Sequence, residues 1–367
     1  MKKRENGIEC LRIVSMLFIV CYHFLYWGGV LDNAALFSGT YFYSWTVNAF
    51  VHVMVNVFVL ITGYYMVASK VKARSILRFA LEVWLVSVTV YAVLCVTGQI
   101  GFSIKDALFA VIPILSRDYW FATNYMGLLI LIPALNLYIT KTTKKQMTWT
   151  LIVLAGLFSV VPSVVFFSDG LKFGNAHGIV WFVVLYFTGG YLRLHKDNIS
   201  PKTGLLVWLV CSLLLAGYKF GMDALSTINI GGRSLRILHN YSVIYYQYNA
   251  LPVYLASIGF FVFFKGWNPR ENGLLDRAVR FFAPVCFYVY LIHDNCHFRF
   301  VLWEIIDPLA MSEQVLFIPL SLLTVLLVFA ACAAIGKVYA LLVAALTKTA
   351  IFSKIEHRVD CLLNIQD

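Results

Sequence analysis

Charged side chains are scarce in this sequence. Asp, Glu, Lys and Arg make up 13% of its 367 residues, whereas hydrophobic residues make up 61%. The mean hydropathy is +0.80. A soluble domain is about a quarter charged and about half apolar, so the composition excludes an ordinary soluble globular protein. It indicates a polytopic integral membrane protein.

The sequence also lacks the cysteine patterns of metal and redox sites. None of the eight cysteines forms a Cys-x-x-Cys pair, and most lie in apolar runs. We expect reduced cysteines that pack among other side chains, and no metal site. The net charge of +11 does not call for a nucleic-acid partner, because inner-membrane proteins concentrate Lys and Arg in cytoplasmic loops.

Ten apolar segments are long enough to cross a bilayer as helices. They cover residues 8–28, 47–68, 76–97, 119–139, 149–167, 178–194, 204–222, 244–265, 281–303 and 315–345. The last is over-long, and we expect it to kink or to leave the membrane near Lys337. The run 106–116 is too short to span and is expected at the interface or as a re-entrant segment. The predicted fold is an all-α bundle of about ten transmembrane helices.

Lys and Arg are unevenly divided between the two sets of loops. Of the 29, twenty fall at the termini and in the loops on their side, six in the other loops, and three within spans. The positive-inside rule therefore places both termini in the cytoplasm of a bacterial-type inner (plasma) membrane. The basic N-terminus lacks a small-residue cleavage site, so we expect a first span rather than a signal peptide. The predicted organisation is one transmembrane domain, 1–347, and a short cytoplasmic tail, 348–367.

The first span carries two polar residues on one helix face. Arg12 and His23 are eleven residues apart, which returns to nearly the same face about 16 Å along the axis. A charge inside a membrane helix costs about 2.5–3.5 kcal/mol, so such residues usually have a partner or a role. Arg12 either snorkels or pairs with Glu9, or it serves a site. His23 either makes an interhelical hydrogen bond or acts in function.

Other spans bring polar residues to the depth of His23 in the predicted topology. These residues are His52, Asn56, Trp120, Asn124, His293, Asp294 and His297. Nearer the cytoplasm, Arg78 and Glu82 are four residues apart and are expected to pair. Lys70, Lys72, Arg74 and Arg78 follow the second span; they are either positive-inside residues or a site for phosphate groups.

The placement of Arg12 and His23 in the first of ten helices resembles the acyltransferase-3 family of membrane acyltransferases. Glu9, three residues before the arginine, and the following LRIVSMLFIVCYHF are also similar. So are the segments VNVFVLITGYYM (55–66), YWFATNYMGLLILIPALN (119–136) and FYVYLIHD (287–294). The resemblance covers nearly the whole chain.

The resemblance implies an O-acyltransferase that moves an acyl group, usually acetyl, from cytoplasmic acyl-CoA to a hydroxyl of a cell-envelope polysaccharide or lipid-linked sugar. It implies that His23 is the catalytic base or acyl relay and that Arg12 faces the coenzyme. Lys70, Lys72, Arg74 and Arg78 stand where the family has a basic cluster, although Arg74-x-x-x-Arg78 replaces the tighter Arg-x-x-Arg of many members. Some members carry a fused hydrolase-like domain, which we do not expect here.

The chemistry suits these residue types. A histidine titrates near neutral pH and, as a general base toward a hydroxyl, typically contributes about 10²–10⁴-fold. The thioester oxygen becomes an oxyanion, for which Asn124, His52 or Trp120 are candidate donors. His293 and Asp294 either orient the catalytic histidine or bind the acceptor. An acetyl-histidine intermediate and direct transfer are both compatible with the sequence.

The rise between the two polar residues of the first span is of the size that a pantetheine arm could cover. We therefore expect the coenzyme phosphates low, near Arg12, the thioester high, near His23, and an acceptor that enters from outside. The competing interpretation is a transporter or exporter of a glycan or small polar solute, since buried His, Arg and Asn suit such movement. The sequence shows no paired broken helices in related halves, which disfavours a transporter.

Overall fold

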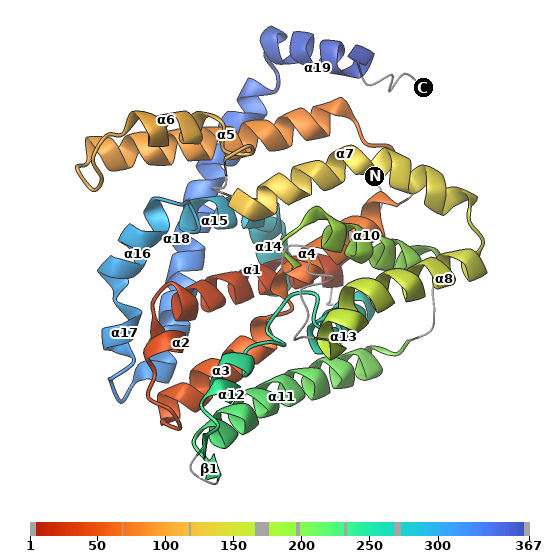
Figure 1. The fold of residues 1–367 in the computed structure, drawn as a ribbon. Helices are drawn as coiled ribbons and strands as arrows, with labels where there is room; N and C mark the ends of the chain where they lie inside the picture. Colours follow the sequence, from red (N-terminus) through yellow and green to blue (C-terminus); the bar gives the residue numbers. More distant parts are fainter. Residues whose placement is uncertain are drawn as a thin grey trace.

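The computed structural model describes residues 5–362, except 68, 117–118, 166–175, 196–198, 231–232 and 268–272. Helices make up almost all of its regular structure (Figure 1). Two two-residue strands, β1 (Asn229–Ile230) and β2 (Arg233–Ser234), pair antiparallel beyond the end of one long helix. The predicted all-α class is confirmed.

Within the described residues, seven helical segments are long and apolar enough to cross a membrane. They are α1 (Asn6–Tyr26), the α3–α4 segment (Gly39–Met66), α5 (Ala73–Val96), α7 (Trp120–Lys141), the segment from α8 to α9 (Lys144–Val164), α11 (Pro201–Ser226) and α18 (Phe317–Leu346). Two shorter apolar helices, α10 (Ile179–Leu194) and α13 (Leu251–Gly266), match further predicted spans. A polytopic membrane bundle is therefore confirmed.

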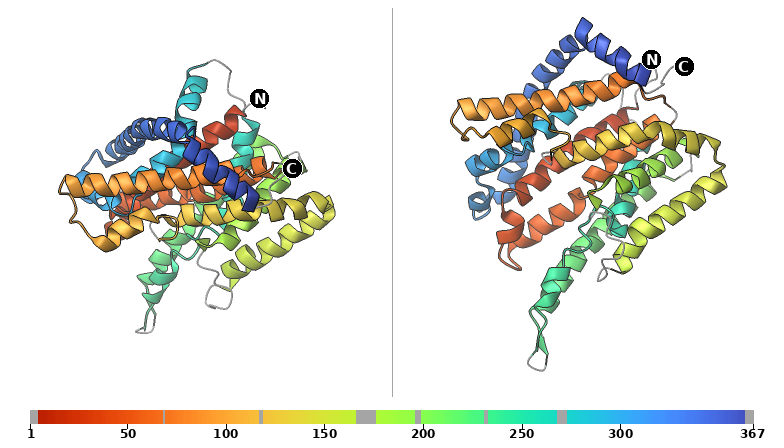
Figure 2. Two further views of the ribbon diagram at one scale, coloured as in Figure 1. Left: turned by 90° about the horizontal axis from the view of Figure 1, so that it is seen from above. Right: turned by 45° about the horizontal axis from the view of Figure 1, so that its top comes forward.

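The centre of the bundle is formed by α1 and the α3–α4 segment, with α5 and α7 along one side and α11 along the opposite side (Figure 1). In the most apolar part of the α3–α4 segment 78% of residues are buried, against 17% from α8 to α9. The far end of α11 projects beyond the other helices together with the β1–β2 pair (Figure 2). The central position of α1 puts its polar face inside the protein.

Glycines allow α4 (Met54–Met66) to lie directly against α10. A Cβ added at Gly63 would lie 2.3 Å from the carbonyl oxygen of Tyr186, and one added at Gly189 would lie 2.3 Å from that of Leu60. Small residues at membrane helix contacts permit such close backbone approach. This contact fixes the depth of α4, which carries part of the site described below.

The second predicted span, 47–68, differs from the structure. It begins earlier, at Gly39, and it is interrupted at His52 and Val53, between α3 (Gly39–Val51) and α4. The side chain of His52 reaches the backbone carbonyl of Tyr246, a contact between segments far apart in the sequence. The predicted span is therefore present as one membrane-crossing segment, with a two-residue irregularity that places His52 at the end of α3.

The ninth predicted span, 281–303, is also broken. It consists of the short η4 (Ala283–Val285), α15 (Cys286–His293) and α16 (Phe298–Ile306). The physical reason lies at Asn295, whose side-chain oxygen accepts hydrogen bonds from the backbone N–H groups of His297 and Phe298 at 3.1 and 3.2 Å. Such local bonds replace those of a continuing helix and start a new one.

Two smaller expectations concern the short run 106–116 and the last span. The short run 106–116 begins within a short helix, α6 (Ile104–Val111), and is too short to span a membrane, as expected. The last span, α18, is one helix that runs through Lys337 without interruption. The Lys337 ammonium lies 4.5 Å from the centre of the Phe281 ring, which gives this cation an aromatic partner.

Loops predicted to share one side of the membrane gather at one end of the bundle. Arg193, near the end of α10, pairs with Glu5, before α1, at 3.0 Å. Arg74, at the start of α5, pairs at 2.8 Å with Glu356 of α19 (Ala350–Leu362), a helix within the predicted tail. These contacts agree with the predicted alternation of loops, while the assignment of this end to the cytoplasm rests on the charge bias.

Candidate functional site

A cavity of about 450 Å³ lies beside the half of α1 that follows Arg12. Met16, Ile19, His23 and Tyr26 of α1 line it, at intervals of three or four residues. One face of the helix therefore forms its wall, and Arg12 lies on that face one turn before Met16. This confirms that Arg12 and His23 share a face. We call this space the His23 cavity.

The imidazole of His23 is held by His293 at the end of α15. Nδ1 of His23 lies 3.0 Å from Nε2 of His293, and Nδ1 of His293 lies 2.5 Å from the carbonyl oxygen of Val289. A carbonyl oxygen only accepts, so a neutral His293 carries its proton on Nδ1 and accepts at Nε2. His23 then donates from Nδ1, and its own Nε2 keeps a lone pair.

This tautomer suits a general base. The side chain of His23 is 12% exposed and borders the cavity, so its Nε2 is the ring atom available to a substrate. Among the described residues no group makes a hydrogen bond to that atom. His293 is fully buried and does not line the cavity, so it acts on His23 and not on a ligand.

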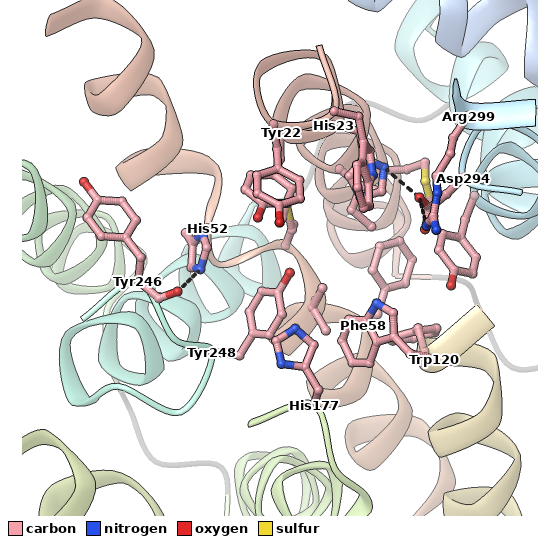
Figure 3. Close-up of a pocket in the computed structure, with 18 of the residues that line it drawn as sticks. Tyr22, His23, His52, Phe58, Trp120, His177, Tyr246, Tyr248, Asp294 and Arg299 are labelled. Carbon is pink, nitrogen blue, oxygen red and sulfur yellow. Dashed lines mark hydrogen bonds and ion pairs between the residues drawn. The ribbon is translucent and has the colours of Figure 1, made fainter. Parts of the chain in front are cut away.

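A carboxylate and a guanidinium, those of Asp294 and Arg299, lie beside His23 (Figure 3). Oδ1 of Asp294 is 3.7 Å from Nδ1 of His23 and 3.5 Å from Nη1 of Arg299. The Arg299 guanidinium lies 4.3 Å from the centre of the Trp27 ring. Asp294, Arg299 and Trp27 all line the His23 cavity. The break that ends α15 therefore brings a compensated charge pair to the catalytic candidate.

His52 lines the cavity, but both of its ring nitrogens are engaged within the protein. Nε2 lies 2.9 Å from the carbonyl oxygen of Tyr246, and Nδ1 lies 3.2 Å from the side-chain oxygen of Asn48. The ring also stacks on Tyr248 with centroids 5.1 Å apart. His52 therefore has no N–H left to donate to an oxyanion. Its position in the cavity wall is compatible with contact to the substrate, but not with stabilising the negative charge of the oxyanion.

The two candidate residues of α7 have different positions. Trp120 lines the cavity and packs on His177 and Tyr248, with ring centroids 4.5 and 5.9 Å away. Asn124 does not line it, because its amide donates to the carbonyl oxygens of Trp120 and His177, both at 2.8 Å. Asn124 thus supports the segment that carries His177 and is not placed to meet a reacting group.

Several lining residues escaped the sequence analysis. His177 precedes its predicted span, Arg299 lies near the end of the predicted ninth span, and Tyr22 and Tyr248 look like ordinary membrane aromatics. In Figure 3 the hydroxyls of Tyr22 and Tyr248 point toward each other across the cavity. The one available signal was the position of Arg299, six residues after His293 within the predicted ninth span.

The residues predicted to face the coenzyme lie away from the cavity. Nη1 of Arg12 pairs with Oε2 of Glu9 at 3.0 Å, which confirms that possible pairing, and 30% of the Arg12 side chain is exposed. Arg78 pairs with Glu82 at 2.9 Å, as expected from their spacing. Lys70 is exposed. The pairing of Arg12 leaves its predicted role in coenzyme binding open to experiment.

Arg74 is bound to the C-terminal helix. Its guanidinium contacts the Glu356 carboxylate, donates to the carbonyl oxygen of Thr347 at 2.9 Å and lies 5.6 Å from the centre of the Phe352 ring. A coenzyme phosphate at Arg74 would compete with the carboxylate. Within the described residues no group of three or more His, Cys, Asp or Glu side chains is arranged to hold a metal ion.

Comparison with known proteins addresses the chemistry. Searches of curated proteins and of solved structures found no match. The acyltransferase-3 family model, described as "Acyltransferase domain", matches residues 5–337, nearly the whole chain. This result favours the enzyme over the transporter, although the structure does contain the two interrupted spans that the sequence did not reveal. The chain belongs to the acyltransferase-3 family and is a membrane acyltransferase.

Proposed function

We propose that this acyltransferase is an O-acetyltransferase of a bacterial-type inner membrane. It moves an acetyl group from cytoplasmic acetyl-CoA to a hydroxyl of a cell-envelope polysaccharide or glycolipid. The observation that carries the proposal is the His23–His293 hydrogen bond at the wall of the cavity. This bond leaves Nε2 of His23 as a base toward an incoming hydroxyl.

In direct transfer the acceptor hydroxyl gives its proton to Nε2 of His23 while its oxygen attacks the thioester carbonyl carbon. A carbon–oxygen bond forms, the tetrahedral oxyanion collapses, and the carbon–sulfur bond breaks. His23 then returns the proton to the coenzyme A thiolate. The products are an O-acetyl ester and a free thiol, with no net change in protons.

Nε2 of His293 accepts a hydrogen bond from Nδ1–H of His23 throughout this cycle. The transient imidazolium is positive, and the Asp294 carboxylate at 3.7 Å offsets that charge. With the amide of Asn124 and both nitrogens of His52 engaged, the indole N–H of Trp120 remains a candidate donor to the oxyanion, and the hydroxyls of Tyr22 and Tyr248 are two further candidates in the cavity wall.

The donor enters from the end of the bundle that carries Arg12. Its phosphate groups bind Arg12 and the rim formed by Lys70, Arg74 and Arg78, because guanidinium groups bind phosphate oxygens in pairs. The pantetheine arm then follows the face of α1 toward His23. The acceptor binds from the opposite end, against the aromatic wall that includes Trp120 and His52.

The proposal is tested in cells by the O-acetyl ester content of purified envelope glycans. Expression of the wild type should add alkali-labile acetyl groups, and His23→Ala should remove them while the protein still inserts in the membrane. His357→Ala, a histidine of α19 that does not line the cavity, is the matched control and should retain them. Normal ester content with His23→Ala would contradict the proposal.

A further inference from the structure

Three polar atoms at one wall of the His23 cavity are buried and make no hydrogen bond within the described part of the protein. They are Nε1 of Trp27, Oδ1 of Asp294 and Nε of Arg299. All three side chains line the cavity. Buried polar groups are almost always satisfied in native proteins, so such a cluster indicates that a polar ligand or water completes it.

The Trp27 indole and the Arg299 guanidinium both face the Asp294 carboxylate, but none of these three atoms has a partner at normal hydrogen-bond geometry, so the contacts satisfy them only incompletely. Nη1 of Arg299 and Nδ1 of His23 lie 3.5 and 3.7 Å from Oδ1 of Asp294, and neither contact has hydrogen-bond geometry. The contacts hold the carboxylate in place, and only 4% of Asp294 is exposed. The guanidinium is also fixed, since it lies 4.3 Å from the Trp27 ring centre and 5.1 Å from that of Phe300.

The unsatisfied atoms comprise two donors and one acceptor. A hydroxyl matches this set, because it gives its hydrogen to Asp294 and accepts from Trp27 or Arg299. The Asp294 carboxylate would repel a phosphate or carboxylate, and the Arg299 guanidinium would repel an ammonium group. An alkyl group would leave all three atoms unsatisfied.

The position of these atoms indicates which hydroxyl of the acceptor binds there. Asp294 borders the same imidazole whose Nε2 takes the proton of the reacting hydroxyl in the proposed reaction. A hydroxyl held by Asp294 therefore stands next to the reacting one on the acceptor. We infer that Trp27, Asp294 and Arg299 form a subsite for a second, unreacting hydroxyl, so that the enzyme acylates one member of a vicinal diol. This inference rests on the proposed function.

The inference is tested with small acceptors that differ by one hydroxyl. Purified protein in lipid nanodiscs receives acetyl-CoA and either cyclohexanol or the cis or trans vicinal diol of cyclohexane, and kcat/KM is measured for each. The variants are Trp27→Phe and Arg299→Lys, which remove the indole N–H and the Nε donor while keeping an aromatic ring and a charge. The ratio of diol to cyclohexanol does not depend on the amount of folded enzyme.

Trp303→Phe is the matched control. Its indole N–H is likewise buried without a hydrogen bond, but Trp303 packs against Phe24, with ring centroids 6.0 Å apart, and does not line the cavity. The control should retain the ratio of the wild type.

The wild type should prefer at least one diol by about tenfold or more in kcat/KM, as expected for a hydrogen bond to a charged group. Each test variant removes one donor while Asp294 remains, so each should lower the ratio relative to the wild type. Equal kcat/KM for diol and cyclohexanol, an unchanged ratio in both variants, or no transfer to any of these alcohols while envelope glycans are acetylated would each overturn the subsite. Absence of transfer to every hydroxyl acceptor would instead overturn the proposed function, and the subsite with it.

Discussion

The hydrogen bond from His293 to His23 gives the most specific prediction about catalysis. His293→Leu removes the acceptor at 3.0 Å from Nδ1 of His23, so the imidazole is free to rotate and to carry its proton on either nitrogen. Its base function should therefore be impaired while the cavity wall is unchanged, because His293 does not line the cavity.

The size of the effect follows from the charge that develops on His23. In the transition state the imidazole becomes positive, and a hydrogen bond to a charged group contributes about 1.5–3 kcal/mol. At about 1.36 kcal/mol per factor of ten, kcat should fall about 10- to 150-fold. This loss should be comparable to or smaller than that of His23→Ala, for which general-base catalysis predicts about 10²–10⁴-fold.

The assay is release of free coenzyme A thiol by purified protein in nanodiscs, with acetyl-CoA and the envelope glycan fraction. The KM for acetyl-CoA should stay unchanged, because the donor-binding residues lie elsewhere. His357→Ala serves as the control for loss of a histidine outside the site. A kcat within twofold of the wild type for His293→Leu would refute the assigned tautomer and the positioning role of His293.

Three further substitutions test other parts of the account. Arg12→Ala should weaken acetyl-CoA binding. A ligand at 100 times its Kd adds about 2.7 kcal/mol of stability, so acetyl-CoA should raise the melting temperature of the wild type more than that of the variant. The same rise in both proteins would show that Arg12 pairs with Glu9 and does not bind the coenzyme. Asn295→Ala should cost at least about 1 kcal/mol, seen as a lower melting temperature, because it removes the two hydrogen bonds before α16 and the buried bond to the Tyr119 hydroxyl. Gly63→Ala should lower the melting temperature more, because its Cβ would lie 2.3 Å from the Tyr186 carbonyl oxygen; an unchanged value would contradict the close contact of α4 with α10.

The sequence was sufficient for what depends on hydrophobic length and helical period. Apolar runs located the helices, and the spacing of Arg12 and His23 predicted the face that now lines the cavity. The pairing of Arg78 with Glu82 followed from their separation within one helix. Each of these properties is local, so that no knowledge of tertiary contacts was needed.

What the sequence did not reveal depends on partners far apart in the chain. The interruption at His52 accompanies a hydrogen bond to the Tyr246 carbonyl, and Arg299 meets Trp27 only after the ninth span has broken. The break itself comes from the side chain of Asn295, whose capping bonds compete with the helix that apolar periodicity predicts. Hydropathy counts such a residue as one polar position and carries no information on its bonds.

The most direct test of the central claim uses purified protein in nanodiscs with acetyl-CoA labelled in the acetyl group. The account predicts that label appears as an alkali-labile ester on the envelope glycan fraction, in step with the release of free thiol, and that His23→Ala abolishes both. Label transfer by His23→Ala at the rate of the wild type would contradict the claim that this histidine carries the reaction.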